Sequence, residues 1–216
     1  MKKILLILAL GVALVSIAAP QALAIGQLVE TLDGRYNSIR SWQADFTQTF
    51  TSGLETRTES GHLYLQKPGR MRWDYTDPVK KTFLVAGKNI WQYTAGEPTA
   101  TLTTVKDSND LRTPLRFLLG HTELNKELEG LSYSGLAPWR QGDVVIYGKP
   151  HAAEAAGWRE VWIEVTPAYE IDRLVIGGLD GSQNDIRLSR IQVNAKLPKE
   201  LFQFRPPAGV RVVPGD

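Results

Sequence analysis

The chain has 216 residues, with 25 lysine and arginine residues against 23 aspartate and glutamate residues, and no cysteine. Its formal net charge of +2 is accounted for by Lys2 and Lys3, because the rest of the chain has equal numbers of basic and acidic residues. This balance gives no support for nucleic-acid binding. The lack of cysteine excludes stabilisation by disulfides and excludes a lipid anchor on an N-terminal cysteine.

The first 24 residues are expected to be a secretory signal peptide. Two lysines precede an apolar run from Ile4 to Ala19, and Ala22-Leu23-Ala24 is a small-x-small cleavage pattern. The alternative is a membrane anchor, but a spanning helix needs about 20 apolar residues and this run is shorter. The sequence therefore predicts export to the periplasm and a single mature domain, residues 25–216.

Hydrophobic periodicity predicts one helix followed by many strands. Leu28, Leu32, Tyr36 and Ile39 recur near helical spacing within residues 25–42. From Gln43 the apolar residues alternate with polar ones, which is typical of a half-buried strand. Strands are predicted at residues 43–50, 61–66, 71–75, 82–86, 90–93, 99–105, 131–136, 143–147, 159–165, 171–176 and 185–194, and the segments 201–204 and 210–213 close the chain.

Short turn sequences separate the strands of the first half. Lys67-Pro68-Gly69, Thr76-Asp77-Pro78 and Gly87-Lys88-Asn89 favour antiparallel pairing of neighbouring strands. In residues 185–194 the apolar parity changes after Leu188, which predicts a bulge or a strongly bent strand. The predicted fold class is mainly β with helices (α+β). A single curved antiparallel sheet of about eleven strands is expected to form an incomplete barrel.

Two short helices are predicted between the two sets of strands. Asp110 is placed to cap a helix that contains Leu111, Leu115, Leu118 and Leu119 and that ends before a glycine. A second short helix is predicted over residues 122–129. Residues 151–157 are predicted to form an exposed loop.

Residue types that perform catalysis are present but not in productive patterns. The three histidines lack a second ligand at the spacing of known metal motifs; they are His62, His121 and His151. The segment Gly130–Gly135 resembles a nucleophile elbow but lacks the glycine required two residues after the serine. Glu160 and Glu164 share one strand face, where carboxylates usually mark the solvated side. The sequence thus predicts no enzyme, no metal site and no cofactor.

The positive signal is a set of large apolar side chains in neighbouring strands. They are Leu63, Leu65, Met71, Trp73, Leu84 and Trp91. One interpretation is an ordinary hydrophobic core. The other is the wall of a hydrophobic cavity, because a strongly curved sheet can enclose more space than its own side chains fill, and short helices would then form a lid.

Five segments together resemble a known family. They are Gln43–Gln48, Lys67–Tyr75, Val85–Tyr93, Thr113-Pro114-Leu115 and Phe202–Val210. In this order and spacing the chain resembles the periplasmic outer-membrane lipoprotein carrier proteins of the LolA type, over essentially the whole predicted mature domain.

The resemblance implies an incomplete β-barrel with a helical lid over a hydrophobic cavity. It also implies a monomeric carrier that takes acylated lipoproteins from an inner-membrane ABC-type lipoprotein release complex and hands them to an outer-membrane lipoprotein acceptor. Neither nucleic acid nor a cofactor is expected to take part.

The resemblance also assigns site residues. In the family a basic residue, usually arginine, precedes the proline and holds the lid shut through hydrogen bonds to main-chain carbonyls. Lys67 stands at that position here, and since lysine lacks the guanidinium fork, Arg70 is a candidate to share this lid latch. Met71 occupies the position of a large aromatic residue near the cavity mouth. The lid is expected to present Leu115, Leu118 and Leu119.

Three other functions remain open from the sequence. A periplasmic sensor or regulatory module with the same fold would bind lipoprotein or a membrane-protein partner. An outer-membrane acceptor would need a lipid anchor, which the missing cysteine argues against. A lipid-modifying enzyme would need a nucleophile and a base in a recognisable arrangement.

Overall fold

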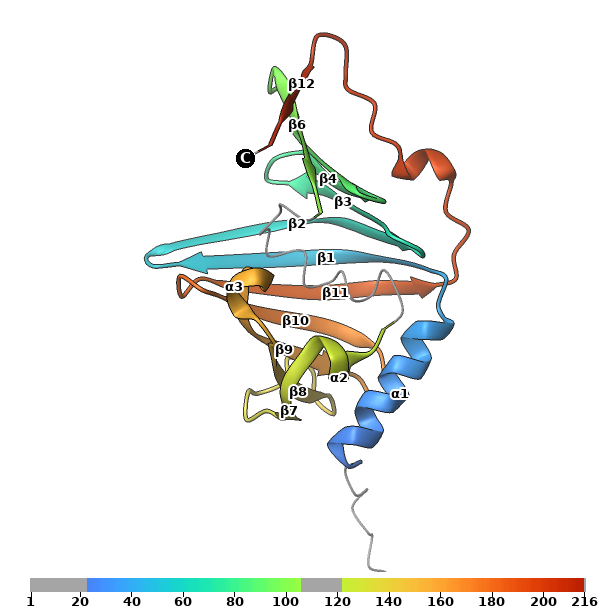
Figure 1. Ribbon diagram of the computed structural model, residues 1–216, viewed down its shortest axis with the longest axis vertical. Helices are drawn as coiled ribbons and strands as arrows, with labels where there is room; N and C mark the ends of the chain where they lie inside the picture. Colours follow the sequence, from blue (N-terminus) through green and yellow to red (C-terminus); the bar gives the residue numbers. More distant parts are fainter. Residues whose placement is uncertain (1–22, 106–121, 216) are drawn as a thin grey trace, which may run out of the picture.

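The structure is a computed structural model and describes residues 23–105 and 122–215. In that part of the chain, twelve strands form a single open sheet with a few short helices (Figure 1). The predicted fold class is therefore confirmed, with one strand more than expected. The predicted helix over residues 110–119 lies outside the described residues.

The strands form two sets of neighbours, and the pairing of the first strand of the chain with the eleventh joins these sets into one sheet. The helical elements are α1 (Ile25–Ser38), α2 (Leu124–Glu127), α3 (Ala153–Ala156) and the 3-10 turn η2 (Lys199–Phe202). The strands are β1 (Ser41–Ser52), β2 (Glu55–Gln66), β3 (Arg70–Asp77), β4 (Lys81–Ala86), β5 (Asn89–Thr94), β6 (Thr99–Thr104), β7 (Leu128–Tyr133), β8 (Val144–Pro150), β9 (Trp158–Val165), β10 (Ile171–Gly178), β11 (Gln183–Val193) and β12 (Arg211–Pro214).

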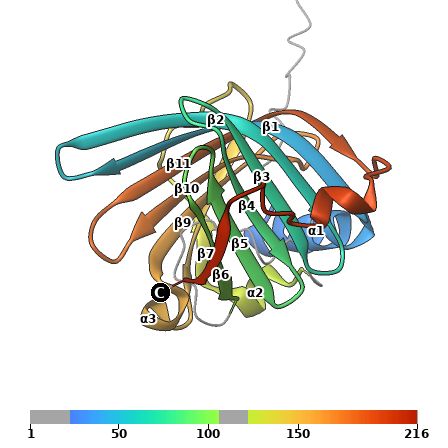
Figure 2. The same cartoon turned by 90° about the horizontal axis from the view of Figure 1, so that it is seen from above.

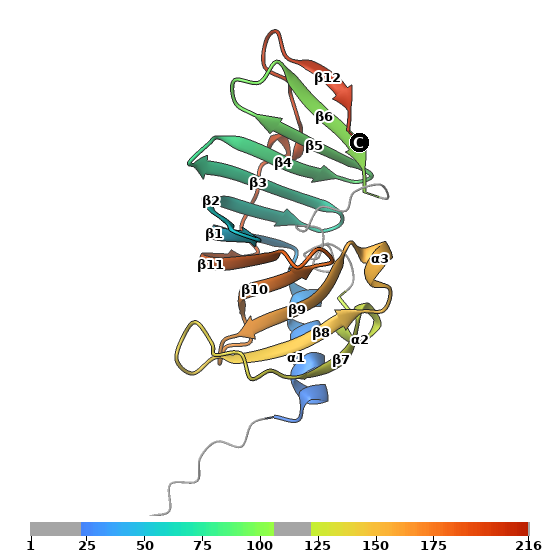
Figure 3. The same ribbon diagram turned by 90° about the vertical axis from the view of Figure 1, so that its left-hand side faces the viewer.

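The strand order is β12-β6-β5-β4-β3-β2-β1-β11-β10-β9-β8-β7. All neighbours pair antiparallel except β12 and β6, which are parallel. The sheet curves around the side that carries α1 and α2 (Figure 3), and a view from above shows the same curvature (Figure 2). We call the side on which α1 packs the concave face and the opposite side the outer face.

The local predictions hold in most places. The bulge is present, because the pairing of β1 with β11 shifts beyond Ser189. Helix α1 ends at Ser38, four residues earlier than predicted, and Trp42 belongs to β1. The period-2 alternation of Trp42 with Ala44 and Phe46 keeps the tryptophan in the core without a longer helix.

The predicted helix over residues 122–129 is also shorter than expected. It is one turn, α2, and β7 begins at Leu128. The predicted loop over residues 151–157 contains the single turn α3. Among the described residues, no helix is long and apolar enough to cross a membrane.

The hydrophobic core lies between the concave face and α1. The buried side of α1 consists of Leu28, Val29, Leu32 and Tyr36. These side chains join one cluster with the inward side chains of β1 to β5 and of β8 to β11. The helix runs over the concave face from the edge strand β7 to the start of β10 and the β2–β3 turn.

Candidate functional site

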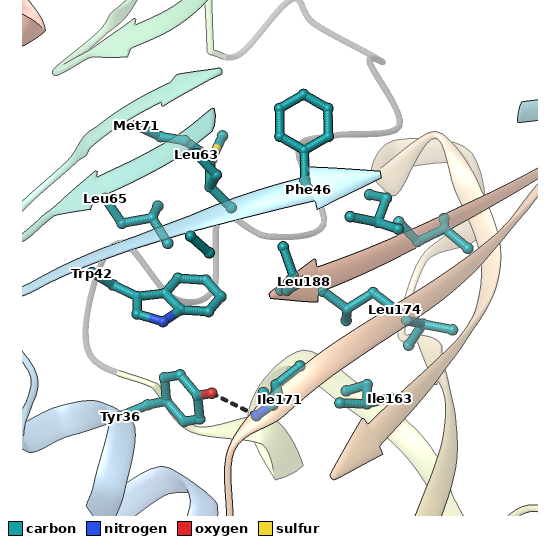
Figure 4. Close-up of a cluster of buried hydrophobic side chains, with 14 of the residues drawn as sticks. Tyr36, Trp42, Phe46, Leu63, Leu65, Met71, Ile163, Ile171, Leu174 and Leu188 are labelled. Atoms are coloured by element: carbon teal, nitrogen blue, oxygen red, sulfur yellow. Dashed lines mark hydrogen bonds between the residues drawn. The ribbon is translucent and has the colours of Figure 1, made fainter. Parts of the chain in front are cut away.

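The concave face of β2 and β3 carries four of the predicted cavity residues. Leu63 pairs with Trp73, and Leu65 pairs with Met71, so alternation places all four on one side of the sheet. Each is at most 4% exposed. Figure 4 shows Leu63, Leu65 and Met71 above Trp42, with Tyr36 of α1 below it. A role for these residues in holding acyl chains stays a prediction.

The other two predicted cavity residues lie on the wrong face. Leu84 pairs with Arg72 and Trp91, and these residues alternate with the core residues of their strands. On the outer face the Trp91 ring stacks on Phe204, with centroids 5.0 Å apart. The C-terminal segment therefore covers these side chains, and the placement of Leu84 and Trp91 in the cavity wall was wrong.

Phe83, Val85 and Ile90 take their place on the concave face. Phe83 pairs with Trp73, and Val85 pairs with both Met71 and Ile90. All three side chains belong to the core cluster. Cross-strand pairing of Met71 and Trp73 with residues of β4 would have identified Phe83 and Val85 as concave-face residues. The sequence of β4 does not show which residues face inward, because the strand is apolar on both faces.

A glycine allows aromatic rings to meet at the centre of this wall. Phe46 packs edge-on against Trp73, with centroids 4.6 Å apart, and against Tyr75 at 4.9 Å. Gly61 lies opposite both Phe46 and Tyr75 in the sheet. A Cβ atom at Gly61 would collide with the main-chain oxygen of Asp74. The close approach of β2 and β3 at this point therefore requires glycine.

Tyr36 connects α1 to both halves of the sheet. Its hydroxyl oxygen accepts a hydrogen bond of 2.8 Å from the buried main-chain amide of Ile171, at the start of β10 (Figure 4). Its main-chain carbonyl accepts a hydrogen bond of 2.8 Å from the Nζ of Lys67, in the turn between β2 and β3. Burial raises the pKa of the Tyr36 phenol, so the hydroxyl stays neutral and able to make this contact.

The predicted latch residue thus binds a main-chain carbonyl, but one at the C-terminal end of α1. Burial lowers the pKa of the half-buried Lys67 ammonium. This direction means that the ammonium group loses part of its hydration, and the hydrogen bond to Tyr36 offsets some of that loss. Arg70, the second predicted latch residue, is exposed and donates a hydrogen bond to Gln66 on its own hairpin.

The packing beside Lys67 leaves little room. A pocket lined by Tyr36, Trp42, Leu65 and Lys67, among others, has a volume of about 10 Å³. That is space for at most about one water molecule. An acyl chain therefore fits beneath α1 at this point only if the helix or its neighbours move.

Helix α1 also holds the chain where it returns from the predicted lid. The side-chain amide of Asn37 donates to the carbonyl of Thr122 at 2.9 Å and accepts from the amide of Thr122 at 2.7 Å. The carboxylate of Asp33 accepts from the amide of Leu124. Thr122 is fully buried. No sequence pattern indicated these contacts, because the partners are about 90 positions apart.

The predicted lid residues lie outside the described residues. They are Leu115, Leu118 and Leu119. Their assignment stays a prediction, although α1 fixes the chain three residues beyond the last of them.

The sequence is similar to one protein family over most of its length. Residues 37–205 match the family described as outer membrane lipoprotein carrier protein LolA. The chain is 32% identical over 205 residues to an outer-membrane lipoprotein carrier protein of Chromobacterium violaceum, covering 93% of this chain and 92% of that one. It is 31% identical over 210 residues to a protein of the same description from Bordetella avium, covering 94% of each.

A solved structure supports the fold independently. The chain is similar to an uncharacterized conserved protein from Thermus thermophilus, with a TM-score of 0.55 and 13% identity, covering 88% of this chain and 99% of that chain. At this identity the similarity concerns the fold alone.

Proposed function

Since the chain belongs to the outer-membrane lipoprotein carrier protein family, we propose that it carries acylated lipoproteins across the periplasm. It accepts them from an inner-membrane ABC-type release complex and delivers them to an outer-membrane acceptor. Family membership also makes it a carrier and not an enzyme. The proposed location follows from the same membership and from the predicted signal peptide.

The concave face supplies the apolar surface that such cargo needs. Burying a lipid chain yields about 0.8 kcal/mol per methylene group, so a multiply acylated protein does not leave a membrane unaided. The proposed acyl-binding wall comprises Leu63, Leu65, Met71 and Trp73, together with Phe83, Val85 and Ile90. The observation that supports the proposal most is that these side chains form one uninterrupted apolar surface across β2 to β5.

Cargo entry requires a change on the covered side of this wall. The small pocket beside Lys67 does not hold an acyl chain as it stands. We therefore assign the moving part to α1 and to the predicted lid that presents Leu115, Leu118 and Leu119. Lys67 is the latch that favours the closed state, and Arg70 is the candidate to assist it when the hairpin moves.

A weak latch suits a carrier that uses no energy source of its own. A ligand shifts a two-state equilibrium only by its differential affinity for the two states. Closed and open states that differ by only a few kcal/mol let acyl chains open the protein on loading and let it close again on delivery.

The direct test is extraction of cargo. The mature protein, residues 25–216, is added to vesicles that contain the release complex, ATP and a triacylated lipoprotein. We expect a soluble complex that elutes with the carrier on gel filtration and that hands the lipoprotein to acceptor-containing vesicles. The same lipoprotein without acyl chains serves as the matched control and should not bind.

Two results would reject the proposal. One is that no soluble complex forms although the release complex is active. The other is that a pull-down from periplasm recovers one signalling protein and no acylated cargo, which would favour the regulatory alternative.

A further inference from the structure

Three carboxyl groups meet on the side of the sheet away from α1. Asp143 immediately precedes β8, Glu164 lies on β9, and Asp172 lies on β10. One ligand oxygen from each lies within 4.8 Å of the others. Glu164 alternates with the core residues Ile163 and Val165, so its side chain points to the outer face.

Two residues of this cluster are buried, Asp143 is half-buried, and the cluster is incompletely hydrogen-bonded. Glu164 and Asp172 are each 1% exposed. Both carboxylate oxygens of Asp172 and the Oδ2 atom of Asp143 are buried and form no hydrogen bond with the described residues. A buried carboxylate without hydrogen bonds is unfavourable unless a cation compensates its charge.

Nearby arginines compensate the cluster only in part. The Nε of Arg140 lies 3.2 Å from Asp172 Oδ2, but the Arg140 side chain is half exposed. The main-chain amide of Arg140 donates a hydrogen bond of 3.0 Å to Glu164 Oε1, so the oxygens without a hydrogen bond belong to the two aspartates. Arg173 lies 3.3 Å from Glu164 Oε2 and also binds Asp185, so its charge is shared.

We propose that Asp143, Glu164 and Asp172 form a binding site for a divalent cation of the Ca²⁺ type. Three carboxylates are hard oxygen ligands, which favour Ca²⁺, Mg²⁺ or Mn²⁺ over softer metals. Two oxygens bound to one Ca²⁺ at about 2.4 Å can be at most about 4.8 Å apart, and the three groups satisfy this limit. Ca²⁺ is preferred to Mg²⁺ because it accepts irregular geometry and bidentate carboxylates.

The bound cation ties the segment before β8 to the outer face of β9 and β10. That segment carries Trp139, whose ring lies against the guanidinium groups of Arg140 and Arg187. A cation between Asp143 and Asp172 takes over the role of Arg140 in neutralising the cluster. It is expected to stabilise this end of the sheet without contacting the acyl-binding wall.

The site is tested with mature protein from which metal has been removed with EDTA. CaCl₂ and MgCl₂ are each titrated by calorimetry, and thermal denaturation is measured with each salt and with EDTA. We expect one Ca²⁺ site, with a dissociation constant in the range of about 10⁻⁴ to 10⁻³ M found for extracellular modules, weaker binding of Mg²⁺, and a higher melting temperature in Ca²⁺.

Variants separate this site from unspecific binding. Asp172→Asn should weaken Ca²⁺ binding by at least about tenfold and remove the Ca²⁺-dependent shift in melting temperature. The control Asp77→Asn changes an exposed aspartate at the end of β3 and should bind as the wild type does. Arg140→Gln removes the competing cation and should tighten Ca²⁺ binding, which gives a readout should Asp172→Asn fold poorly.

Three outcomes would overturn the proposal. They are a wild-type melting temperature that Ca²⁺ does not change, equal Ca²⁺ affinity in the wild type and Asp172→Asn, and unchanged or weaker affinity in Arg140→Gln. Any of them would mean that the cluster is neutralised by shared protons and the arginines alone.

Discussion

The ammonium group of Lys67 donates a hydrogen bond of 2.8 Å to the main-chain carbonyl of Tyr36. This contact joins the β2–β3 turn to the last turn of α1, on the covered side of the proposed acyl-binding wall. The same carbonyl also accepts a hydrogen bond of 3.3 Å from the main-chain amide of Ile39, which caps the helix. Carbonyls at a helix C-terminus carry partial negative charge, so a second donor that is a cation is favourable there. Lys67 thus binds a main-chain carbonyl, the type of acceptor expected for the proposed latch.

Lys67→Leu removes this contact and should bias the carrier toward its open state. We expect the free energy of unfolding to fall by about 1–2 kcal/mol, because one charge-assisted hydrogen bond of a half-buried group is lost. If the contact belongs only to the closed, empty state, cargo binding tightens and delivery to the acceptor slows by about 5- to 30-fold. Urea denaturation and a vesicle transfer assay measure the two effects.

Lys67→Arg is the matched control, since it keeps a cationic donor at the same place. It should load and deliver as the wild type does. Normal delivery by Lys67→Leu would contradict the assignment of Lys67 as the latch.

Asn37→Leu should release the chain that follows the predicted lid. The substitution removes both hydrogen bonds that the Asn37 side chain forms with the main chain of the buried Thr122. We expect a loss of about 1–3 kcal/mol and faster hydrogen exchange at the amides of Thr122 and Leu124. Ser38→Ala removes a hydrogen bond within α1 and is the control. Equal exchange at Thr122 in both variants would show that Asn37 is not the anchor.

Photocrosslinking should distinguish the two faces of the sheet. p-Benzoylphenylalanine is placed at Phe83 on the concave face or at Trp91 on the outer face, two aromatic positions on neighbouring strands. After loading with an acylated lipoprotein and irradiation, we expect a covalent adduct from position 83 and little or none from position 91. Adducts of similar yield from both positions would reject the concave face as the acyl-binding wall.

Gly61→Ala should destabilise the wall at its centre. The added methyl group meets the main-chain oxygen of Asp74, so β2 and β3 must move apart. We expect a loss of more than about 2 kcal/mol in the free energy of unfolding and altered near-ultraviolet circular dichroism from Trp73. Gly34→Ala, on the exposed side of α1, adds the same methyl group into open space and should stabilise by up to about 1 kcal/mol. Similar stability of the two variants would disprove the role given to Gly61.

The strand faces that were predicted correctly and those that were not have different physical origins. Met71 and Trp73 were assigned to the correct face of β3, because the charged residues that alternate with them mark the opposite face. Leu84 was misplaced because β4 is buried on both faces, by the core on one side and by the C-terminal segment on the other. Alternation identifies an inward face only when the outward face is polar.

The sequence by itself determined the class of fold, the family and the large apolar residues of β2 and β3, because these depend on local periodicity, turn residues and motif order. Only the tertiary structure decided which face each residue of β4 and β5 occupies, that Lys67 binds the end of α1, and that Asn37 holds Thr122. It also brought Asp143, Glu164 and Asp172 together from separate positions in the chain. Those relations depend on strand register and on the path of the curved sheet, which residues distant in sequence fix jointly and which no local pattern encodes.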